Sequence, residues 1–163
     1  MCIRDSIYPE LHSLSIKIQR QDAVTILLGE IWWDIVTNRK EYLNKVLNRI
    51  NNVTGVHLDK IFIKQHPGEV KHLEGLTSGV EFIPKKLPLE LFYLVASGKI
   101  KRLYLFTHGS TAVLNLWSLF SADCPVKIVI MQDSCFGRQY KLNLDRFCHL
   151  ADKFGVMYSL ANL

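Results

Sequence analysis

The stretch LYLFTHGSTAVLNL, residues 103–116, decides the fold. It opens with a short continuous run of apolar residues, which is typical of a strand covered on both faces. A polar loop that contains Gly109 follows directly. From about Ser110 the pattern is that of a helix, which we expect to extend to about Phe120. A strand that passes through a short loop into a helix is the repeating unit of an α/β fold.

The same alternation of strand and helix patterns runs along most of the chain. Residues 23–28 (AVTILL) form a continuous apolar run, and a helix is expected at residues 39–51, where apolar residues recur three and four positions apart. Pro88 opens another helix in its first turn, where the missing N–H costs little. These patterns predict an α/β domain with a Rossmann-like parallel sheet and helices on both faces. Further strands are expected at residues 60–65, 80–83, 102–106, 126–131 and 156–160, and a last helix at residues 144–154.

Composition narrows the class of protein. A chain of 163 residues that is 48% hydrophobic can bury one substantial core, so we expect one domain. The net charge is +5, but the basic residues are dispersed and interleaved with acids, so we expect no nucleic-acid partner. The four cysteines have no CxxC spacing, which predicts neither a metal site nor a disulfide framework. A reducing cytoplasm is the expected setting.

The first 22 residues lie outside the predicted α/β domain. Residues 1–6 (MCIRDS) resemble a translated sequencing-adapter scar, so we interpret residues 1–22 as a scar and an interdomain segment. Residues 23–163 are then the Rossmann-like domain. No apolar run reaches the length of about 18 to 20 residues that spans a bilayer. The basic surface is compatible with peripheral association at the inner face of the cell membrane.

Three loops follow predicted strands directly, at residues 29–30, 66–69 and 107–111. In parallel α/β sheets, ligands bind beyond the carboxyl ends of the strands, where such loops form a crevice. The loops therefore contain the candidate site residues.

The loop at residues 107–111 has the features of a phosphate site. Gly109 permits close approach of the backbone, and Ser110 and Thr111 lie where a helix begins. The N–H groups and the dipole of a helix N-terminus attract phosphate. Serine at such a position also commonly caps its helix, so both interpretations of Ser110 remain open.

A histidine and a glutamate complete the candidate set. Pro67 restricts His66 to an extended conformation at the end of its strand, where the ring can donate a hydrogen bond or a proton. His66 can equally be an ordinary turn residue. Glu90 lies in the first turn of the helix opened by Pro88, where acids are favoured by the dipole and can also bind ribose hydroxyls.

Taken in order, the segments KQHPGE, IPKKLPLELF and LYLFTHGSTAVLNL resemble the nucleotide-binding half of bacterial sialyltransferases with a GT-B fold. The resemblance is to the polysialyltransferase and lipooligosaccharide sialyltransferase families, the latter being glycosyltransferase family 52, and covers residues 23–163. Those families share a His-Pro motif, matched by His66 and Pro67, and a later Ser-Ser or Ser-Thr motif, matched by Ser110 and Thr111. An acidic residue on the helix between the motifs corresponds to Glu90.

The resemblance implies a donor-binding domain for CMP-sialic acid in an inverting, metal-independent transferase with no cofactor. His66 would hydrogen-bond or protonate the departing phosphate, and Ser110 and Thr111 would stabilise its charge. Glu90 would hold the ribose. Residues near Gly29 and Glu30 would line the cytidine pocket, and Gly109 would approach the phosphate.

The family places the general base and much of the glycan acceptor site on an N-terminal domain, in an acidic motif ending in glycine. Nothing before Ala23 matches that motif, so we expect these 163 residues alone to bind nucleotide without transferring sialic acid. Two alternatives remain open. One is another GT-B glycosyltransferase that uses a UDP-sugar, a GDP-sugar or CDP-glycerol. The other is a non-catalytic α/β interaction domain.

Overall fold

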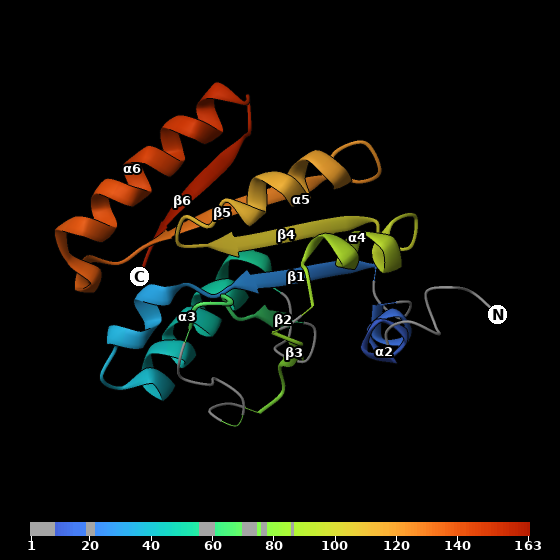
Figure 1. Ribbon diagram of the computed structural model, residues 1–163, viewed down its shortest axis with the longest axis horizontal. Helices are drawn as coiled ribbons and strands as arrows, with labels where there is room; N and C mark the ends of the chain where they lie inside the picture. Colours follow the sequence, from blue (N-terminus) through green and yellow to red (C-terminus); the bar gives the residue numbers. More distant parts are fainter. Residues whose placement is uncertain (1–8, 19–21, 56–60, 70–74, 76–77, 86) are drawn as a thin grey trace.

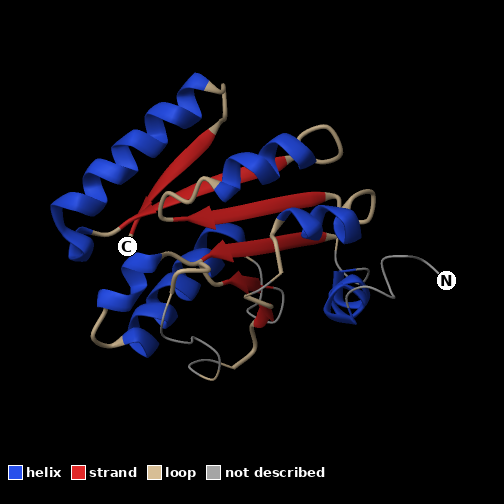
Figure 2. Cartoon of the chain, viewed as in Figure 1, coloured by secondary structure: helices blue, strands red, loops and turns tan. Residues whose placement is uncertain are grey.

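The fold is built on one sheet of six parallel strands in the order β3-β2-β1-β4-β5-β6. The computed structural model describes residues 9–18, 22–55, 61–69, 75, 78–85 and 87–163. The strand arrows in Figures 1 and 2 point the same way, so the loops that follow the strands share one edge of the sheet. The strands are β1 (Ala23–Leu28), β2 (Ile61–Lys64), β3 (Glu81–Ile83), β4 (Arg102–Thr107), β5 (Val126–Gln132) and β6 (Tyr158–Asn162).

Helices cover both faces of this sheet, and the predicted α/β class with a Rossmann-like parallel sheet is therefore confirmed. Figure 1 shows α4 and α5 on the near side of the sheet and α3 behind β1, the arrangement that right-handed crossovers produce. The helices are α2 (Pro9–Ile18), α3 (Arg39–Thr54), α4 (Glu90–Ala96), α5 (Ala112–Phe120) and α6 (Gly137–Lys153), with 3-10 turns η1 (Ile31–Ile35) and η3 (Ser134–Phe136).

Local sequence explains the boundaries of α3. The side-chain oxygen of Asn38 accepts a hydrogen bond from the Glu41 N–H at 3.2 Å, which satisfies a donor of the first turn. The helix ends at Gly55, whose φ of 68° is the left-handed conformation that glycine adopts without a steric penalty. Between them Val46 and Ile50, four residues apart, are fully buried against the sheet.

Three elements differ from the sequence prediction. Helix α2 was not expected, yet its Leu11, Leu14 and Ile18 are part of the same core cluster as the sheet. Helix α6 begins at Gly137, seven residues before the predicted start at 144, because Tyr140 continues its buried face. Strand β6 pairs from Tyr158 onward, later than predicted. The proposed scar at residues 1–6 and residue 60 of the predicted second strand lie outside the described residues.

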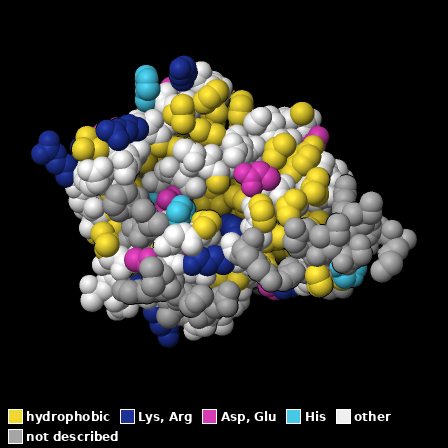
Figure 3. All heavy atoms as spheres, viewed as in Figure 1, with side chains coloured by type: hydrophobic (Ala, Val, Ile, Leu, Met, Phe, Trp, Pro, Cys, Tyr) yellow, Lys and Arg dark blue, Asp and Glu magenta, His cyan; other side chains and the backbone are white. Residues whose placement is uncertain are grey.

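The surface carries charge without one continuous basic stripe on the face shown in Figure 3. Lys and Arg side chains are scattered there, and apolar side chains gather on part of the same face. One exposed apolar residue, Leu94, belongs to α4. Among the described residues, no helix is long and apolar enough to cross a membrane.

Candidate functional site

A cavity of about 490 Å³ lies at the carboxyl edge of the sheet. We call it the edge cavity. The ends of β1 and β2 form one side, and the segments that lead into α4 and α5 form the other. Strands β1 and β2 are adjacent and parallel, so their terminal loops meet here. The lining residues are Leu28, Gly29, Lys64, Gln65, His66, Pro67, Lys85, Leu87, Pro88, Leu89, Glu90, Ser110, Thr111 and Ala112.

Six of the eight sequence-predicted site residues line the edge cavity. They come from three different loops and the start of α4, separated by up to 82 positions along the chain. The two others, Glu30 and Gly109, are not part of its lining. The six are Gly29, His66, Pro67, Glu90, Ser110 and Thr111.

Hydrogen bonds within the turn after β2 fix the state of the His66 ring. The Gly68 N–H donates to Nδ1 of His66 at 3.0 Å, so Nδ1 accepts and the proton of the neutral ring lies on Nε2. Partial burial and the nearby charge of Lys85 lower the pKa of His66. The ring is thus neutral at pH 7, with Nε2–H as its hydrogen-bond donor.

The buried carboxyl group of Glu69 stabilises the turn at His66 and Pro67 through hydrogen bonds. Its Oε1 accepts from the His66 backbone N–H at 2.9 Å, and its Oε2 accepts from the Gln65 side chain at 3.2 Å. Burial raises the pKa of Glu69, partly offset by these two hydrogen bonds. The conformation of the histidine-proline turn therefore depends on a glutamate outside the predicted site residues.

Gly29 allows β1 and the turn after β2 to approach closely. The Gly29 N–H donates to the Lys64 carbonyl at 2.7 Å. A Cβ at position 29 would lie 2.3 Å from Oε1 of Glu69 and 3.2 Å from two backbone atoms. The glycine is thus required by packing inside the protein, whether or not a ligand also approaches it.

Replacing Gly29 with alanine is expected to lower the free energy of unfolding by about 1–3 kcal/mol, the usual cost of forcing a methyl group into a packed site. Glu69 cannot move away without losing its bond to the His66 N–H. Urea denaturation followed by circular dichroism measures the change. Gly98→Ala is the comparison, since no atom of the described residues lies within 4 Å of its added Cβ and only its φ of 70° is strained. An equal loss in both variants would contradict the close-approach explanation.

Glu30 is buried and turned toward the inside of the domain. Its carboxyl accepts a hydrogen bond from the Thr107 hydroxyl at 3.4 Å. Burial raises the pKa of Glu30 to about 8, the hydrogen bond from Thr107 lowers it, and the charge of Glu69 raises it further. Glu30 is therefore protonated at pH 7. Its assignment to the cytidine pocket stays a prediction.

Thr107 organises the loop between β4 and α5. Its buried hydroxyl oxygen accepts from the Gly109 N–H at 3.0 Å and from the Ser110 N–H at 2.7 Å. Gly109 has a φ of 120° and packs against the side chain of Phe147, which explains the glycine without any ligand. The Ser110 N–H is already used, so Ser110 offers the cavity its hydroxyl group.

The start of α5 differs from a conventional serine cap. Helix α5 begins at Ala112 with Thr111 as its N-cap, and among the described residues no side-chain hydrogen bond caps it. The Ser110 carbonyl accepts from the Val113 N–H at 3.2 Å, so the interpretation of Ser110 as a helix cap stays a prediction. The hydroxyl groups of Ser110 and Thr111 both belong to the cavity lining.

Glu90 begins α4 and links it to α5. Its Oε1 accepts a hydrogen bond from the Asn115 side chain at 3.0 Å, on the exposed side of both helices. Its second carboxylate oxygen can still accept from a ligand, because a carboxylate has two acceptor oxygens. Glu90 therefore combines the helix-terminal role and the cavity position that the sequence left open.

Two lysines of the edge cavity were missed by the sequence analysis. Lys64 is only 6% exposed, and its Nζ donates to the carbonyls of Pro84 at 2.8 Å and Lys85 at 2.7 Å. Nζ of Lys85 donates in turn to the Glu69 carbonyl. The signal was present in the sequence, since a lysine in the apolar run IFIK has no place in a strand buried on both faces unless it is paired or functional.

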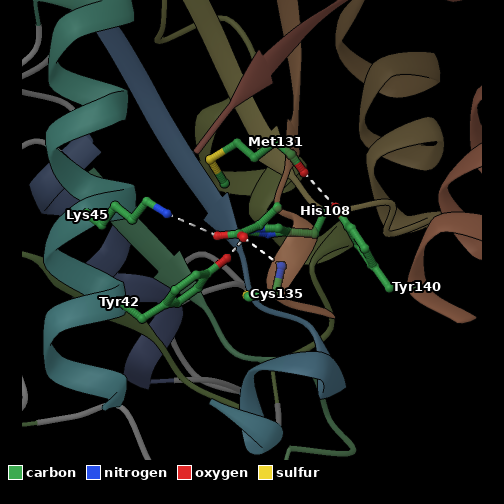
Figure 4. A network of polar contacts seen from close by, with 7 residues as sticks. Tyr42, Lys45, His108, Met131, Cys135 and Tyr140 are labelled. Atoms are coloured by element: carbon green, nitrogen blue, oxygen red, sulfur yellow. Dashed lines mark hydrogen bonds and ion pairs between the residues drawn. The ribbon is translucent and has the colours of Figure 1, made fainter. Parts of the chain in front are cut away.

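His108, which lies in the same loop as Gly109, belongs to a buried aromatic cluster instead of the cavity. Figure 4 shows it beside Tyr42 and Tyr140, and its Nε2 lies 2.9 Å from the Tyr42 hydroxyl. The rings of Trp33 and Phe136 meet it edge-on. Burial lowers the pKa of His108 to about 3, so it is a neutral packing residue.

Tyr140 of the aromatic cluster also lines a second cavity of about 600 Å³, beyond the ends of β5 and β6. The Tyr140 hydroxyl donates to the Met131 carbonyl at 2.7 Å (Figure 4). Lys45 pairs with Asp133 at 3.4 Å. This lining includes none of the sequence-predicted site residues.

Within the part of the chain that the structure describes, no group of three or more His, Cys, Asp or Glu side chains could hold a metal ion. Comparison with protein-family models, curated proteins and solved structures finds no match to this chain. The functional interpretation therefore depends on the geometry of the edge cavity and on the motifs in its walls.

Proposed function

We propose that this chain is the donor-binding domain of an inverting bacterial sialyltransferase or polysialyltransferase, with CMP-sialic acid as the donor. The observation that supports the proposal most strongly is the joint presence of the His66-Pro67 turn, Glu90 and Ser110-Thr111 in one cavity. These segments are far apart in the sequence, and each has a hydrogen-bonding side chain suited to one part of a nucleoside monophosphate, a donor at His66, Ser110 and Thr111 and an acceptor at Glu90. An interaction domain without a ligand gives no reason for them to meet.

The chemistry assigned to the site is stabilisation of a leaving phosphate. When the glycosidic bond of CMP-sialic acid breaks, negative charge develops on the phosphate of CMP. Nε2–H of His66 and the hydroxyls of Ser110 and Thr111 would hydrogen-bond those oxygens, a preorganised electrostatic contribution that needs no metal. Because His66 is neutral at pH 7, we assign it as a hydrogen-bond donor in preference to a fully ionised acid.

The remaining parts of the donor are assigned by chemistry alone. The free acceptor oxygen of Glu90 would bind the ribose hydroxyls, as acidic residues do in dinucleotide folds. Gly29 lies at the wall where a flat base could approach the backbone. The acceptor glycan, and the acidic side chain that would take its proton, belong in the resembling families to a separate N-terminal domain.

Calorimetry with a series of nucleotides tests the proposal. We expect the chain to bind CMP at least about tenfold more tightly than UDP, GDP or CDP, a free-energy difference of about 1.4 kcal/mol. His66→Ala should weaken CMP binding by about tenfold through loss of one hydrogen bond to a charged group. Preference for a nucleoside diphosphate would indicate a different GT-B transferase. Absence of binding by every nucleotide would indicate an interaction domain.

A further inference from the structure

The edge cavity contains a buried cation whose neighbours do not neutralise it. Lys64 is one of the few charged residues buried in the described part of the chain, and it lies at the end of a strand whose other residues are apolar. Among the described residues, no carboxylate forms an ion pair with it. Its two hydrogen-bond partners are the backbone carbonyls of Pro84 and Lys85, which carry no net charge.

An ammonium group has three N–H donors, and the two carbonyls use two of them. Since Lys64 is part of the cavity wall, the third N–H is left for an occupant of the cavity. A second cation, Lys85, lines the same cavity while its Nζ donates to the Glu69 carbonyl. Two positive charges that face one cavity without a bound counter-ion repel each other, and an anion between them removes that repulsion.

We propose that Lys64 is a substrate-binding residue that pairs with the phosphate dianion of a nucleoside monophosphate in the edge cavity. The inference rests on the proposed function and extends it by naming the charge that the site requires of its ligand. Buried charges in proteins are normally paired, and the pair is completed here only when the ligand is present.

The titration of Lys64 supports this geometry and supplies a measurable signature. Burial, together with the charge of Lys85, lowers the pKa of Lys64 to about 8, and the charge of Glu90 opposes this shift. A phosphate dianion beside Nζ favours the charged form and raises the pKa again. At pH 8 about half of the free protein has a neutral Lys64, so binding takes up about half a proton per ligand.

The proton taken up on binding could also come to other titratable groups near the cavity, so their titration has to be distinguished from that of Lys64. The pKa of His66 is lowered from its usual 6.5, so His66 stays neutral between pH 7 and 9. A phosphomonoester with a second pKa near 6 is a dianion throughout that range. Glu30 also titrates near pH 8, and burial raises the pKa of Glu69. Glu30 is the group whose pKa matches that of Lys64. Glu30→Gln removes its titration, because glutamine does not titrate.

The experiment is calorimetry of CMP binding at pH 7, 8 and 9 in two buffers of different ionisation enthalpy. For the wild-type chain we expect uptake of about half a proton at pH 8 and a loss of affinity of about tenfold between pH 7 and 9, since only the charged Lys64 binds well. In Glu30→Gln the proton uptake per bound CMP is compared and not the affinity, because Glu30 is itself a predicted site residue, and this variant should still take up the proton.

Two variants of Lys64 test the residue directly. Lys64→Met should weaken CMP binding by about 10- to 100-fold, the loss of a charge-assisted hydrogen bond, while leaving the binding of cytidine unchanged. Lys64→Arg keeps a charge that does not titrate, so in the Glu30→Gln background it should bind CMP between pH 7 and 9 without proton uptake. A purely structural Lys64 predicts equal losses for CMP and cytidine, together with a lower melting temperature.

The outcomes separate the two proposals. CMP binding that is unaffected by Lys64→Met, or proton uptake that persists when Lys64→Met is combined with Glu30→Gln, would overturn the role of Lys64 and leave the proposed function standing. If Lys64→Met fails to fold, loss of the wild-type pH dependence in Lys64→Arg still decides. If the wild-type chain binds inorganic phosphate through Lys64 but not CMP, the nucleotide assignment fails and the anion site remains. If the chain binds neither CMP nor phosphate, the proposed function and the role of Lys64 are both overturned.

Discussion

Replacing Thr107 with valine is expected to lower the free energy of unfolding by about 2–4 kcal/mol, because the change orphans several buried polar groups at once. The Thr107 hydroxyl is fully buried and accepts from the N–H groups of Gly109 and Ser110. It also donates to the Glu30 carboxyl. Valine has the same shape but none of these bonds, so each group that loses its partner adds a desolvation penalty.

A threonine in the next strand of the sheet provides a matched control for this prediction. Thr25 is also fully buried, but its hydroxyl oxygen has no hydrogen-bond partner among the residues that the structure describes. Thr25→Val should therefore leave stability unchanged or raise it, since it removes an unsatisfied polar atom. Chemical denaturation of both variants makes the comparison. Similar losses in the two would show that the Thr107 hydrogen bonds contribute little.

Thr107→Val should also change ligand binding in the edge cavity. The Thr107 hydroxyl holds the loop whose Ser110 lines the edge cavity. If the proposed function is right, Thr107→Val should weaken CMP binding and Thr25→Val should not, because Thr25 is remote from that loop in the sequence and is not part of the lining. Isothermal titration of the two folded variants measures this difference.

Replacing Phe92 with alanine should have the largest effect on stability, a loss of about 3–5 kcal/mol. Phe92 is fully buried on α4, and its ring meets those of Phe62 at 6.2 Å and Phe120 at 6.1 Å between centroids. These rings join β2, α4 and α5. Alanine would leave a cavity at the point where the three elements meet, and the rest of the core can fill it only in part.

Leu94→Ala on the same helix is the control, since its side chain is 39% exposed and its removal opens little space inside the core. We expect it to change the free energy of unfolding by less than about 1 kcal/mol. Thermal unfolding monitored by circular dichroism compares the two. A small effect of Phe92→Ala would mean that α4 contributes little to the cooperative core, and that Glu90 is held mainly through Asn115.

Much of the fold follows from local sequence pattern. Continuous apolar runs such as residues 23–28 are typical of strands covered on both faces, as in a parallel sheet between helices. Once the strands are parallel, the loops after β1, β2 and β4 share one edge, so their meeting at a single crevice was predictable. The start of α6 was missed because Tyr140 continues the buried face within a mostly polar segment.

The candidate site was only partly predictable. The sequence predicted six of the residues that line the edge cavity, because each lies directly after a strand or at the start of a helix. It did not predict that Glu30 would turn toward Thr107, nor that Thr107 would use the N–H of Ser110. Those contacts depend on β1 and β4 being neighbours, although 74 positions separate Leu28 from Arg102.

The sequence by itself determined the class of fold, the edge where the loops gather and the residue types found there, since all of these follow from patterns within a few residues. Only the tertiary structure decided which of those side chains face the cavity. The buried Lys64 shows the reason most clearly, because its partners are carbonyls of residues 84 and 85 on another segment. Hydrogen bonds between distant segments are set by strand order and packing, which no local pattern encodes.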